Sequence, residues 1–127
     1  MTVLLDASAL LALLNQEAGA DVVEEHMSDA VVLAVNLEEV IGTLMRNGMS
    51  PALVERALLP LAVPVVPFTE EMAWRSGERR AQLPEALGMA DRCCLAAAAA
   101  NHLPVLTADT RWTAAATAFK VQVTQIR

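Results

Sequence analysis

Short apolar runs recur along the chain and predict buried β-strands. Each run is only a few residues long and rich in Val and Leu, which favours a strand over a helix. Pro64 and Pro67 restrict backbone pairing in one run, which is therefore expected to be an edge strand or a short segment. The last run alternates in polarity and fits a second edge strand. The expected strands cover residues 3–5, 30–35, 63–68, 103–106 and 120–126.

Helical spacing or helix start signals fill the segments between these runs. One apolar stripe starts at Leu37 and continues at i+3, i+4, i+7 and i+8. The polar residues of that helix lie on the opposite side, at Asn36, Glu39, Thr43 and Arg46. The expected helices cover residues 7–14, 18–27, 36–47, 51–59, 70–82, 89–100 and 110–119.

The alternation of strands and helices predicts an α/β fold. We expect a mainly parallel central sheet of about five strands with helices on both faces, in a single domain over residues 1–127. Crossover connections in such sheets are right-handed, so the carboxyl ends of the strands share one edge. Ligands bind in the crevice at that edge. Pro84 and Gly88 bracket a loop.

Acidic side chains follow three of the expected strands. Asp6 follows the first strand, Glu39 lies at the start of the helix after the second, and Asp109 follows the fourth. Because these strands end at the same edge, we expect the three acids to lie close together. Asp91 opens a helix that is apolar all round and is expected to be buried, but spacing alone does not bring it to the same place.

Helix capping is an alternative role for these acids. Asp6 or Ser8 can cap the helix that follows, and Asn36 with Glu39 has the form of a capping box. A carboxylate at Asp91 is favoured by the helix dipole. Capping alone works as well with Ser, Thr or Asn, so repeated acids at these points require a further reason.

A hard divalent cation supplies that reason. Several carboxylates in one crevice repel one another, which costs folding stability unless a cation compensates. Mg²⁺ binds through carboxylate oxygens, and waters or a substrate phosphate complete its shell.

Composition limits the other function classes. The chain has 127 residues, 55% hydrophobic content and a net charge of −6. That balance argues against a protein that coats nucleic acid with a basic surface, but it does not exclude a nuclease with an acidic metal centre. The N-terminus has no basic leader and no apolar stretch is long enough to span a membrane, so we expect a cytosolic protein.

Cysteine and histidine positions give no sign of a disulfide or a zinc site. Cys93 and Cys94 are adjacent in an apolar helix, where a mutual disulfide would be strained, so we expect small buried residues in a reducing compartment. His26 and His102 lack the spacing of zinc ligands.

Four segments together resemble the PIN-domain family, and within it the VapC-type toxins of bacterial and archaeal toxin–antitoxin pairs. They follow the family's order across essentially the whole chain, at residues 3–9, 36–40, 89–96 and 105–112. On this resemblance, the acids that match the family's quartet are Asp6, Glu39, Asp91 and Asp109. Ser8 and Thr107 match polar positions beside the quartet.

The resemblance implies a three-layer sandwich and a Mg²⁺- or Mn²⁺-dependent endoribonuclease that hydrolyses RNA phosphodiester bonds. Asp6, Asp91 and Asp109 would bind or orient the metal and its waters. Glu39 would be a ligand or a water-positioning base, and Ser8 would orient a carboxylate. The resemblance also implies a homodimer that is inhibited by a cognate antitoxin.

Three arginines are candidates for contacts with RNA phosphates or with a partner: Arg46, Arg92 and Arg111. Ordinary ion pairs with neighbouring acids are the alternative for each of them.

Other classes agree less well with the sequence. A haloacid-dehalogenase-like phosphatase needs a second acid two residues after its aspartate, where Ser8 stands. A receiver domain needs a lysine after a late strand, whereas Lys120 precedes the last one. The five glycines form no nucleotide-binding fingerprint. The remaining alternative is a metal-binding RNA or partner module of the same fold that lacks turnover.

Overall fold

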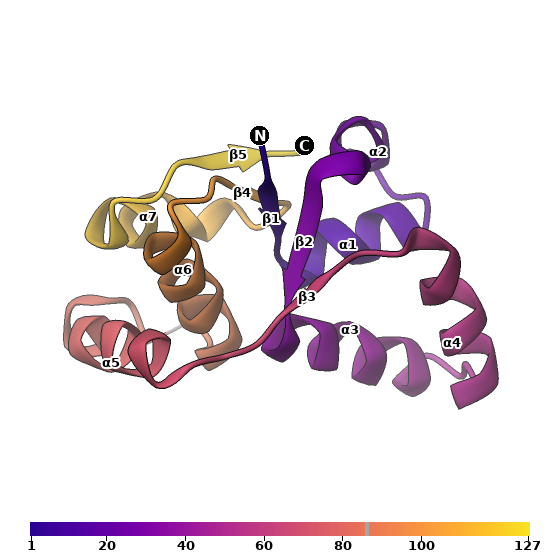
Figure 1. Ribbon diagram of the computed structural model, residues 1–127, viewed down its shortest axis with the longest axis horizontal. Helices are drawn as coiled ribbons and strands as arrows, with labels where there is room; N and C mark the ends of the chain where they lie inside the picture. The colour runs from indigo at the N-terminus through magenta and orange to yellow at the C-terminus, as the bar shows by residue number, and fades with distance from the viewer. Residues whose placement is uncertain (86) are drawn as a thin grey trace.

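The computed structural model describes residues 1–85 and 87–127, and it has three layers, with a β-sheet between two sets of helices (Figure 1). The strands are β1 (Val3–Leu5), β2 (Ala30–Leu33), β3 (Val65–Val66), β4 (Val105–Thr107) and β5 (Val123–Gln125). The helices are α1 (Ala7–Leu14), α2 (Ala20–His26), α3 (Ala34–Arg46), α4 (Pro51–Leu58), α5 (Glu70–Arg79), α6 (Met89–Asn101) and α7 (Thr113–Phe119).

The sheet has the order β3-β2-β1-β4-β5, and each of its pairings is parallel. The predicted parallel α/β sheet, with β3 and β5 at its edges, is therefore confirmed. Leu5 at the end of β1 pairs with Val32 on one side and Leu106 on the other. The central strands thus end side by side, and the residues that follow them leave the sheet at the same edge.

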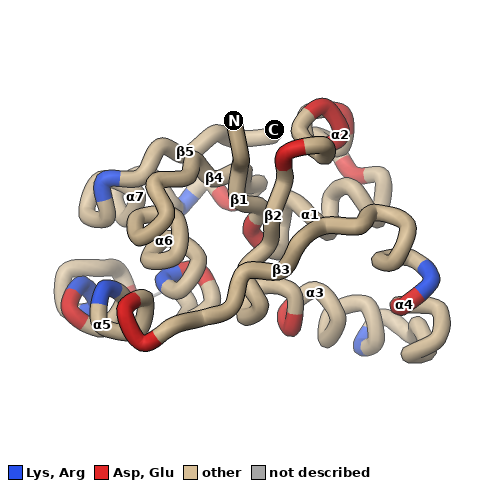
Figure 2. The backbone as a smooth tube through the Cα atoms, in the orientation of Figure 1, with Lys and Arg blue, Asp and Glu red and all other residues tan. Residues whose placement is uncertain are grey.

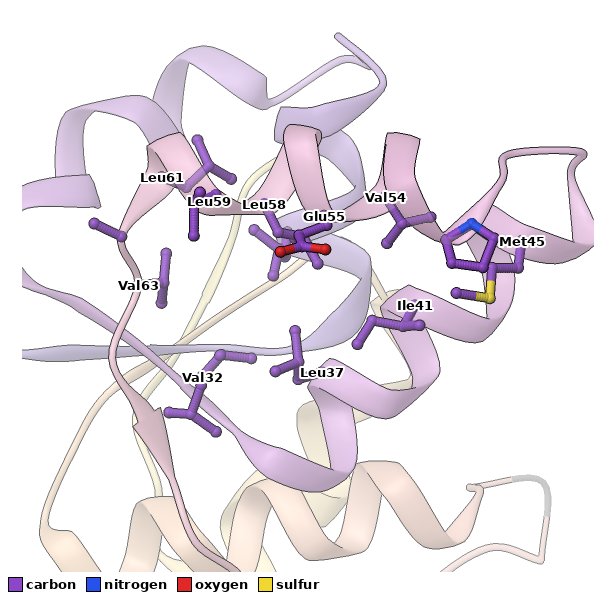
Figure 3. Close-up of a pocket in the computed structure, with 14 residues that line it drawn as sticks. Val32, Leu37, Ile41, Met45, Val54, Glu55, Leu58, Leu59, Leu61 and Val63 are labelled. Atoms are coloured by element: carbon purple, nitrogen blue, oxygen red, sulfur yellow. The ribbon is translucent and has the colours of Figure 1, made fainter.

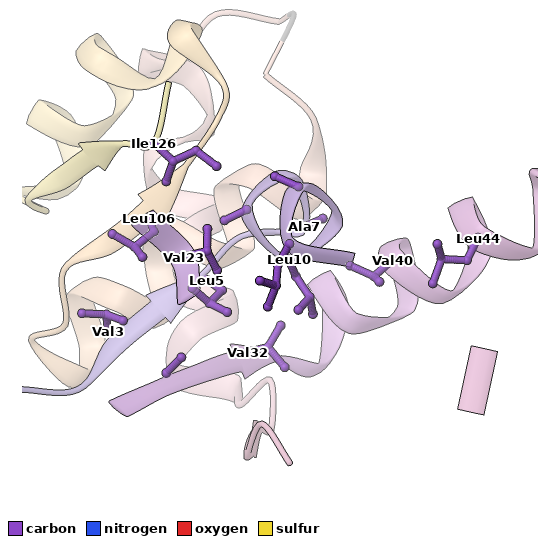
Figure 4. Close-up of a cluster of buried hydrophobic side chains, with 14 of the residues drawn as sticks. Val3, Leu5, Ala7, Leu10, Val23, Val32, Val40, Leu44, Leu106 and Ile126 are labelled. Carbon is purple, nitrogen blue, oxygen red and sulfur yellow. The ribbon is translucent and has the colours of Figure 1, made fainter. Parts of the chain in front are cut away.

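Successive side chains of β1 point to opposite faces of the sheet, and apolar residues bury both faces. Leu5 packs with Leu10 of α1, Val23 of α2 and other residues of one apolar cluster (Figure 4). Leu4 belongs to the cluster on the other face, together with Trp112 and the apolar residues of α6. The all-apolar helix α6 is buried as predicted, and its Cys93 and Cys94 side chains are buried and free of disulfides.

The start of α3 differs from the prediction. β2 ends at Leu33, which pairs with Val66 in the last position of β3, so the chain turns into the helix at Ala34. Leu33 is the residue before the helix, and its side chain makes no capping bond. The predicted capping box of Asn36 and Glu39 is therefore wrong, because both residues lie within the helix.

Smaller differences occur at other element ends. Part of the predicted helix 110–119 is a 3₁₀ turn over Thr110–Trp112 that leads into α7. β4 starts two residues later than predicted and includes Thr107. The predicted loop between Pro84 and Gly88 contains residue 86, which lies outside the described residues. In the described ranges, none of the helices is long and apolar enough to cross a membrane.

Two glycines give a matched test of the backbone. Gly19 has φ of 94°, and a Cβ there would lie 2.7 Å from the carbonyl oxygen of Ile126. Gly77 lies inside α5, and a Cβ there would meet no atom within 4 Å. We expect Gly19→Ala to lower the free energy of unfolding by about 1–3 kcal/mol and Gly77→Ala to raise it by about 0.5–1 kcal/mol. Urea denaturation measures both, and an unchanged stability in Gly19→Ala would contradict this packing.

Candidate functional site

The structure brings four acids to one pocket at the carboxyl edge of the sheet. Asp6, Glu39, Asp91 and Asp109 line this acidic pocket, which has a volume of about 190 Å³. Asp6 follows β1, Glu39 lies on the helix after β2, and Asp109 follows β4, so the strand order β2-β1-β4 explains three of the positions. Asp91 arrives from the first turn of α6, which packs against α3.

The Asp6 carboxylate is buried and held by three residues. Only 2% of Asp6 is exposed. Its Oδ1 accepts hydrogen bonds from the Ser8 hydroxyl at 2.7 Å and from the Ala9 backbone N–H at 2.8 Å. Its Oδ2 accepts a hydrogen bond from the Thr107 hydroxyl at 2.5 Å. Burial raises the pKa of Asp6 to about 6, although these hydrogen bonds favour the charged form.

Ser8 and Thr107 connect Asp6 to the segment that carries Asp109. The Ser8 hydroxyl accepts a hydrogen bond from the backbone N–H of Ala108 at 2.9 Å. The Thr107 hydroxyl accepts one from the backbone N–H of Asp109, also at 2.9 Å. The two hydroxyl groups therefore fix the positions of Asp6 and the Asp109 backbone relative to each other.

Glu39 and Asp91 lie in the field of the other acids. Desolvation by the pocket walls raises the pKa of Glu39, and the charges of Asp91 and Asp6 raise it further. Burial also raises the pKa of Asp91, with a further contribution from Asp109, while a backbone hydrogen bond from Gly88 opposes the shift. The charges at this edge thus destabilise one another, as expected for uncompensated carboxylates at short range.

Asp109 is the exception, because it has a cationic partner. Nη2 of Arg111 lies 2.6 Å from Oδ2 of Asp109, and Nε of Arg111 lies 2.9 Å from Oδ1. The backbone N–H of Arg111 donates to the same Oδ1 at 2.9 Å. These bonds lower the pKa of Asp109, in contrast to the other three acids.

Capping is also present at three of the four acids. Asp6 caps α1 through the Ala9 N–H, and Asp109 caps the 3₁₀ turn after it through the Arg111 N–H. Asp91 accepts a hydrogen bond from the Gly88 N–H at 3.2 Å. The local role that the sequence suggested therefore coexists with convergence in one pocket.

Of the three candidate arginines, Arg111 lines the acidic pocket. Arg46 is exposed in the last turn of α3, away from Glu39. Arg92 donates from Nη1 to the carbonyl oxygen of Leu87 at 2.9 Å and lines a different pocket, beside Arg80. Arg46 and Arg92 therefore do not line the acidic pocket, although the charge of Arg92 acts on the neighbouring Asp91.

Asn36 has a positional role that the sequence did not indicate. It was expected on the polar side of its helix, yet it is completely buried, and its Nδ2 donates to the carbonyl oxygen of Ala90 at 3.2 Å. This bond ties α3 to the first turn of α6, next to Asp91. Thr43 also lines the pocket, and its spacing of i+4 from Glu39 could have indicated this.

The donor set fits a hard divalent cation. The acidic pocket offers carboxylate and hydroxyl oxygens, which are the ligands that Mg²⁺ and Mn²⁺ prefer. In the conformation described for residues 1–85 and 87–127, no three His, Cys, Asp or Glu side chains are already close enough to hold an ion. Ion binding would therefore require the carboxylates to move toward one another.

A second pocket, of about 390 Å³, has a different character (Figure 3). It lies between α3, α4 and the segment that leads to β3, and apolar side chains such as Ile41 and Leu58 line it together with the carboxylate of Glu55. It lacks the convergent acids that metal chemistry requires.

Comparisons with solved structures agree with the α/β sandwich. A toxin–antitoxin complex from Klebsiella pneumoniae is 17% identical, with a TM-score of 0.76, over 99% of this chain and 98% of that one. VapBC2 from Rickettsia felis, bound to a promoter DNA fragment, is 13% identical with a TM-score of 0.78, over 98% of both chains. FitAcB from Neisseria gonorrhoeae is 24% identical with a TM-score of 0.73, again over 98% of both. At these identities the likeness shows a shared fold.

The sequence itself matches the PIN domain family over residues 3–118. The chain therefore belongs to the PIN-domain family. A search of curated proteins gave no match.

Removal of the buried charge tests the electrostatics of the pocket. The pKa of Asp6 is about 6 in the folded protein against an ordinary value of 3.8, so the folded state binds the proton more tightly, and its stability falls as the pH rises through this window. In chelator at pH 8, we expect Asp6→Asn to raise the free energy of unfolding by up to about 3 kcal/mol, and the gain to vanish near pH 4.

Asp109→Asn is the matched control, because it removes a carboxylate with a lowered pKa and a cationic partner. Its stability at pH 8 should fall rather than rise. Chemical denaturation at several pH values measures both variants, and a destabilised Asp6→Asn at pH 8 would contradict the account of the buried charge.

Proposed function

We propose that this protein is a cytoplasmic, divalent-metal-dependent endoribonuclease of the VapC type, the toxin of a toxin–antitoxin pair. The observation that carries the proposal is the convergence of Asp6, Glu39, Asp91 and Asp109 in one pocket, where three of the four have raised pKa values. Folding alone gains nothing from such crowding. Membership of the PIN-domain family and the likeness to toxin–antitoxin complexes support the proposal.

Three aspartates are the proposed metal ligands. When bound through Asp6, Asp91 and Asp109, Mg²⁺ or Mn²⁺ supplies a Lewis acid that polarises a phosphoryl oxygen and lowers the pKa of an attacking water. Asp6 is oriented for this role by Ser8 and Thr107, whose hydroxyl groups both donate to its carboxylate. Replacement of either hydroxyl group would remove one of the donors that orient Asp6 without removing a ligand.

Glu39 is the proposed base. Its side chain remains accessible in the pocket, and partial burial together with the neighbouring acids raises its pKa, which makes it a better proton acceptor than an ordinary glutamate. The Ser8 hydroxyl is engaged with Asp6 and Ala108, so it serves as a holder of Asp6 rather than a nucleophile. An activated water is therefore the proposed attacking group.

Phosphate recognition depends on local charge. The eight arginines and the single lysine, Lys120, are spread along the chain, and Figure 2 shows them on several separate elements. With a net charge of −6, the protein as a whole repels a phosphate backbone. A cation held among the acids of the pocket would give a phosphodiester a local positive charge to bind.

Protein partners are part of the same proposal: a cognate antitoxin and a second copy of the chain. Several large apolar side chains are exposed, among them Leu59 (74%), Met89 (65%) and Trp74 (64%). A partner that covered such side chains would remove apolar area from water. The apolar pocket of Figure 3 adds to it.

Neighbouring glutamates give a direct test of activity. Glu39 lines the acidic pocket, whereas Glu38 is also exposed on α3 but does not line it. With single-stranded RNA and Mn²⁺, we expect Glu39→Gln to lower the cleavage rate by about 100-fold or more, because a general base is lost. Glu38→Gln should cleave at the wild-type rate. Gel analysis of the RNA fragments measures both.

Cleavage by neither the wild type nor Glu38→Gln, on a panel of RNAs of varied sequence, would contradict the nuclease proposal. If these proteins still bound Mn²⁺ and RNA, the alternative of a PIN-fold module without turnover would replace it.

Metal should also stabilise the protein. A ligand that binds only the folded state raises the melting temperature. We expect Mg²⁺ or Mn²⁺ to raise the melting temperature of the wild type and to have no effect on Asp91→Asn, which without metal should melt no lower than the wild type. Asp21→Asn, on the exposed surface of α2, is the control that should still respond. An equal response of all three proteins would place the ion outside this pocket.

A further inference from the structure

Arg111 occupies an unusual place for an arginine, because it lines a pocket whose other charged groups are all acids. Its guanidinium group contacts both carboxylate oxygens of Asp109, at 2.6 Å to Oδ2 and 2.9 Å to Oδ1. A paired fork of this kind is a strong form of charge-assisted hydrogen bond. Asp109 is therefore already bound to a cation, one that the chain itself provides.

The same oxygens are those that a metal ion would need. Oδ1 of Asp109 accepts from both the Arg111 backbone N–H and its Nε, and Oδ2 accepts from Nη2. A metal ion and the guanidinium group would therefore compete for the negative charge of the Asp109 carboxylate. The acidic side chains in the described part of the chain do not form a ready metal site, and Asp109 is the pocket acid whose carboxylate forms an ion pair with an arginine.

The surrounding backbone is fixed while the two side chains can rearrange. The Asp109 N–H donates to the Thr107 hydroxyl at 2.9 Å, and the Asp109 carbonyl oxygen accepts from Nε2 of Gln125 at 2.9 Å. The Arg111 side chain is 59% exposed, so rotation of its guanidinium group requires no repacking of the core. A change of partner at Asp109 is thus a local side-chain movement.

We propose that Arg111 is an internal counter-ion that competes with the divalent ion for Asp109, so that metal binds fully only when the guanidinium group leaves that carboxylate. This inference rests on the proposed metal site. In the apo protein Arg111 stabilises the crowded acids, and once displaced it remains at the pocket, where it can pair with an RNA phosphate. Metal and RNA then favour each other's binding, because each removes the contact that opposes the other.

Mn²⁺ titration of the purified full-length protein without RNA tests the competition. Electron paramagnetic resonance of free Mn²⁺ gives the dissociation constant and does not depend on activity. We expect Arg111→Ala to bind Mn²⁺ roughly three- to tenfold more tightly than the wild type, because the competing ion pair is absent. In Asp109→Asn, addition of Arg111→Ala should have a smaller effect, because the carboxylate with which Arg111 pairs is absent and only its charge interaction with Asp91 remains.

Two further variants separate competition from the general field of a positive charge. Arg111→Lys keeps the charge but cannot form the fork, so competition predicts tighter binding than in the wild type. Arg92→Ala removes a nearby charge that acts on Asp91 but whose guanidinium group contacts Leu87 instead of Asp109, so it should tighten Mn²⁺ binding less than Arg111→Ala does. If Arg111→Lys matched the wild type and Arg92→Ala matched Arg111→Ala, a simple field effect would replace the proposal.

The outcomes also separate this inference from the proposed function. If Mn²⁺ bound to the wild type and equally to Arg111→Ala, the internal counter-ion would be refuted and the metal site would stand. If Mn²⁺ bound to none of the proteins, the metal site itself would fall, and the inference with it.

A coupling measurement completes the test. A non-hydrolysable single-stranded RNA should strengthen Mn²⁺ binding to the wild type more than to Arg111→Ala. In the wild type, an RNA phosphate can pair with the guanidinium group and keep it away from Asp109, whereas Arg111→Ala has no such group. Equal strengthening of both proteins would refute the proposed transfer of Arg111 from Asp109 to phosphate.

Discussion

The buried carboxylate of Asp6 is the constraint on which the rest of this edge depends. It lies at the end of the central strand β1, and the Ser8 hydroxyl, the Ala9 N–H and the Thr107 hydroxyl all donate to it. Its raised pKa shows that these bonds do not fully offset the cost of burial. The same bonds join α1 to the end of β4, so the polypeptide around the pocket is organised by a group that is costly to keep charged.

The acids have local and shared roles at once. Asp6, Asp91 and Asp109 each accept a backbone N–H at the start of a helix or turn, which a neutral cap would do at lower electrostatic cost. Their charge becomes an advantage only toward a cation. Arg111 provides one such cation inside the chain, and a divalent ion is the proposed second. Asp109 can thus pair either with Arg111 or with the proposed metal ion, so metal binding depends on the position of the Arg111 side chain.

Much of this arrangement could be predicted from the sequence. The apolar runs identified the strands, and the shared edge of a parallel sheet was enough to predict that Asp6, Glu39 and Asp109 lie together. Asp91 was associated with them only through the family resemblance, because its place depends on how α6 packs against α3. The hydrogen bond from Asn36 to Ala90 is part of that packing. The sequence did not predict it, because Asn36 was interpreted as a helix cap.

The start of α3 and the contact between Arg111 and Asp109 could not be predicted from sequence patterns. The boundary between β2 and α3 is decided by where the neighbouring strand stops pairing, since Ala34 and Val35 suit either element. The contact between Arg111 and Asp109 spans only two residues and depends on the 3₁₀ turn that follows Asp109, whereas the pattern predicted a regular helix there. Spacing alone therefore could not distinguish Arg111 from Arg46 and Arg92.

Asp6, Asp91 and Asp109 are proposed to bind one divalent cation, with Glu39 beside it in the same pocket. Anomalous diffraction from crystals soaked in Mn²⁺ tests this claim most directly, because the signal locates the ion without reference to activity. The account predicts a peak in the acidic pocket, bound by the carboxylates of Asp6 and Asp91, with Asp109 turned from Arg111 toward the ion. An empty pocket at saturating Mn²⁺, or a peak bound only by acids outside it, would contradict the account.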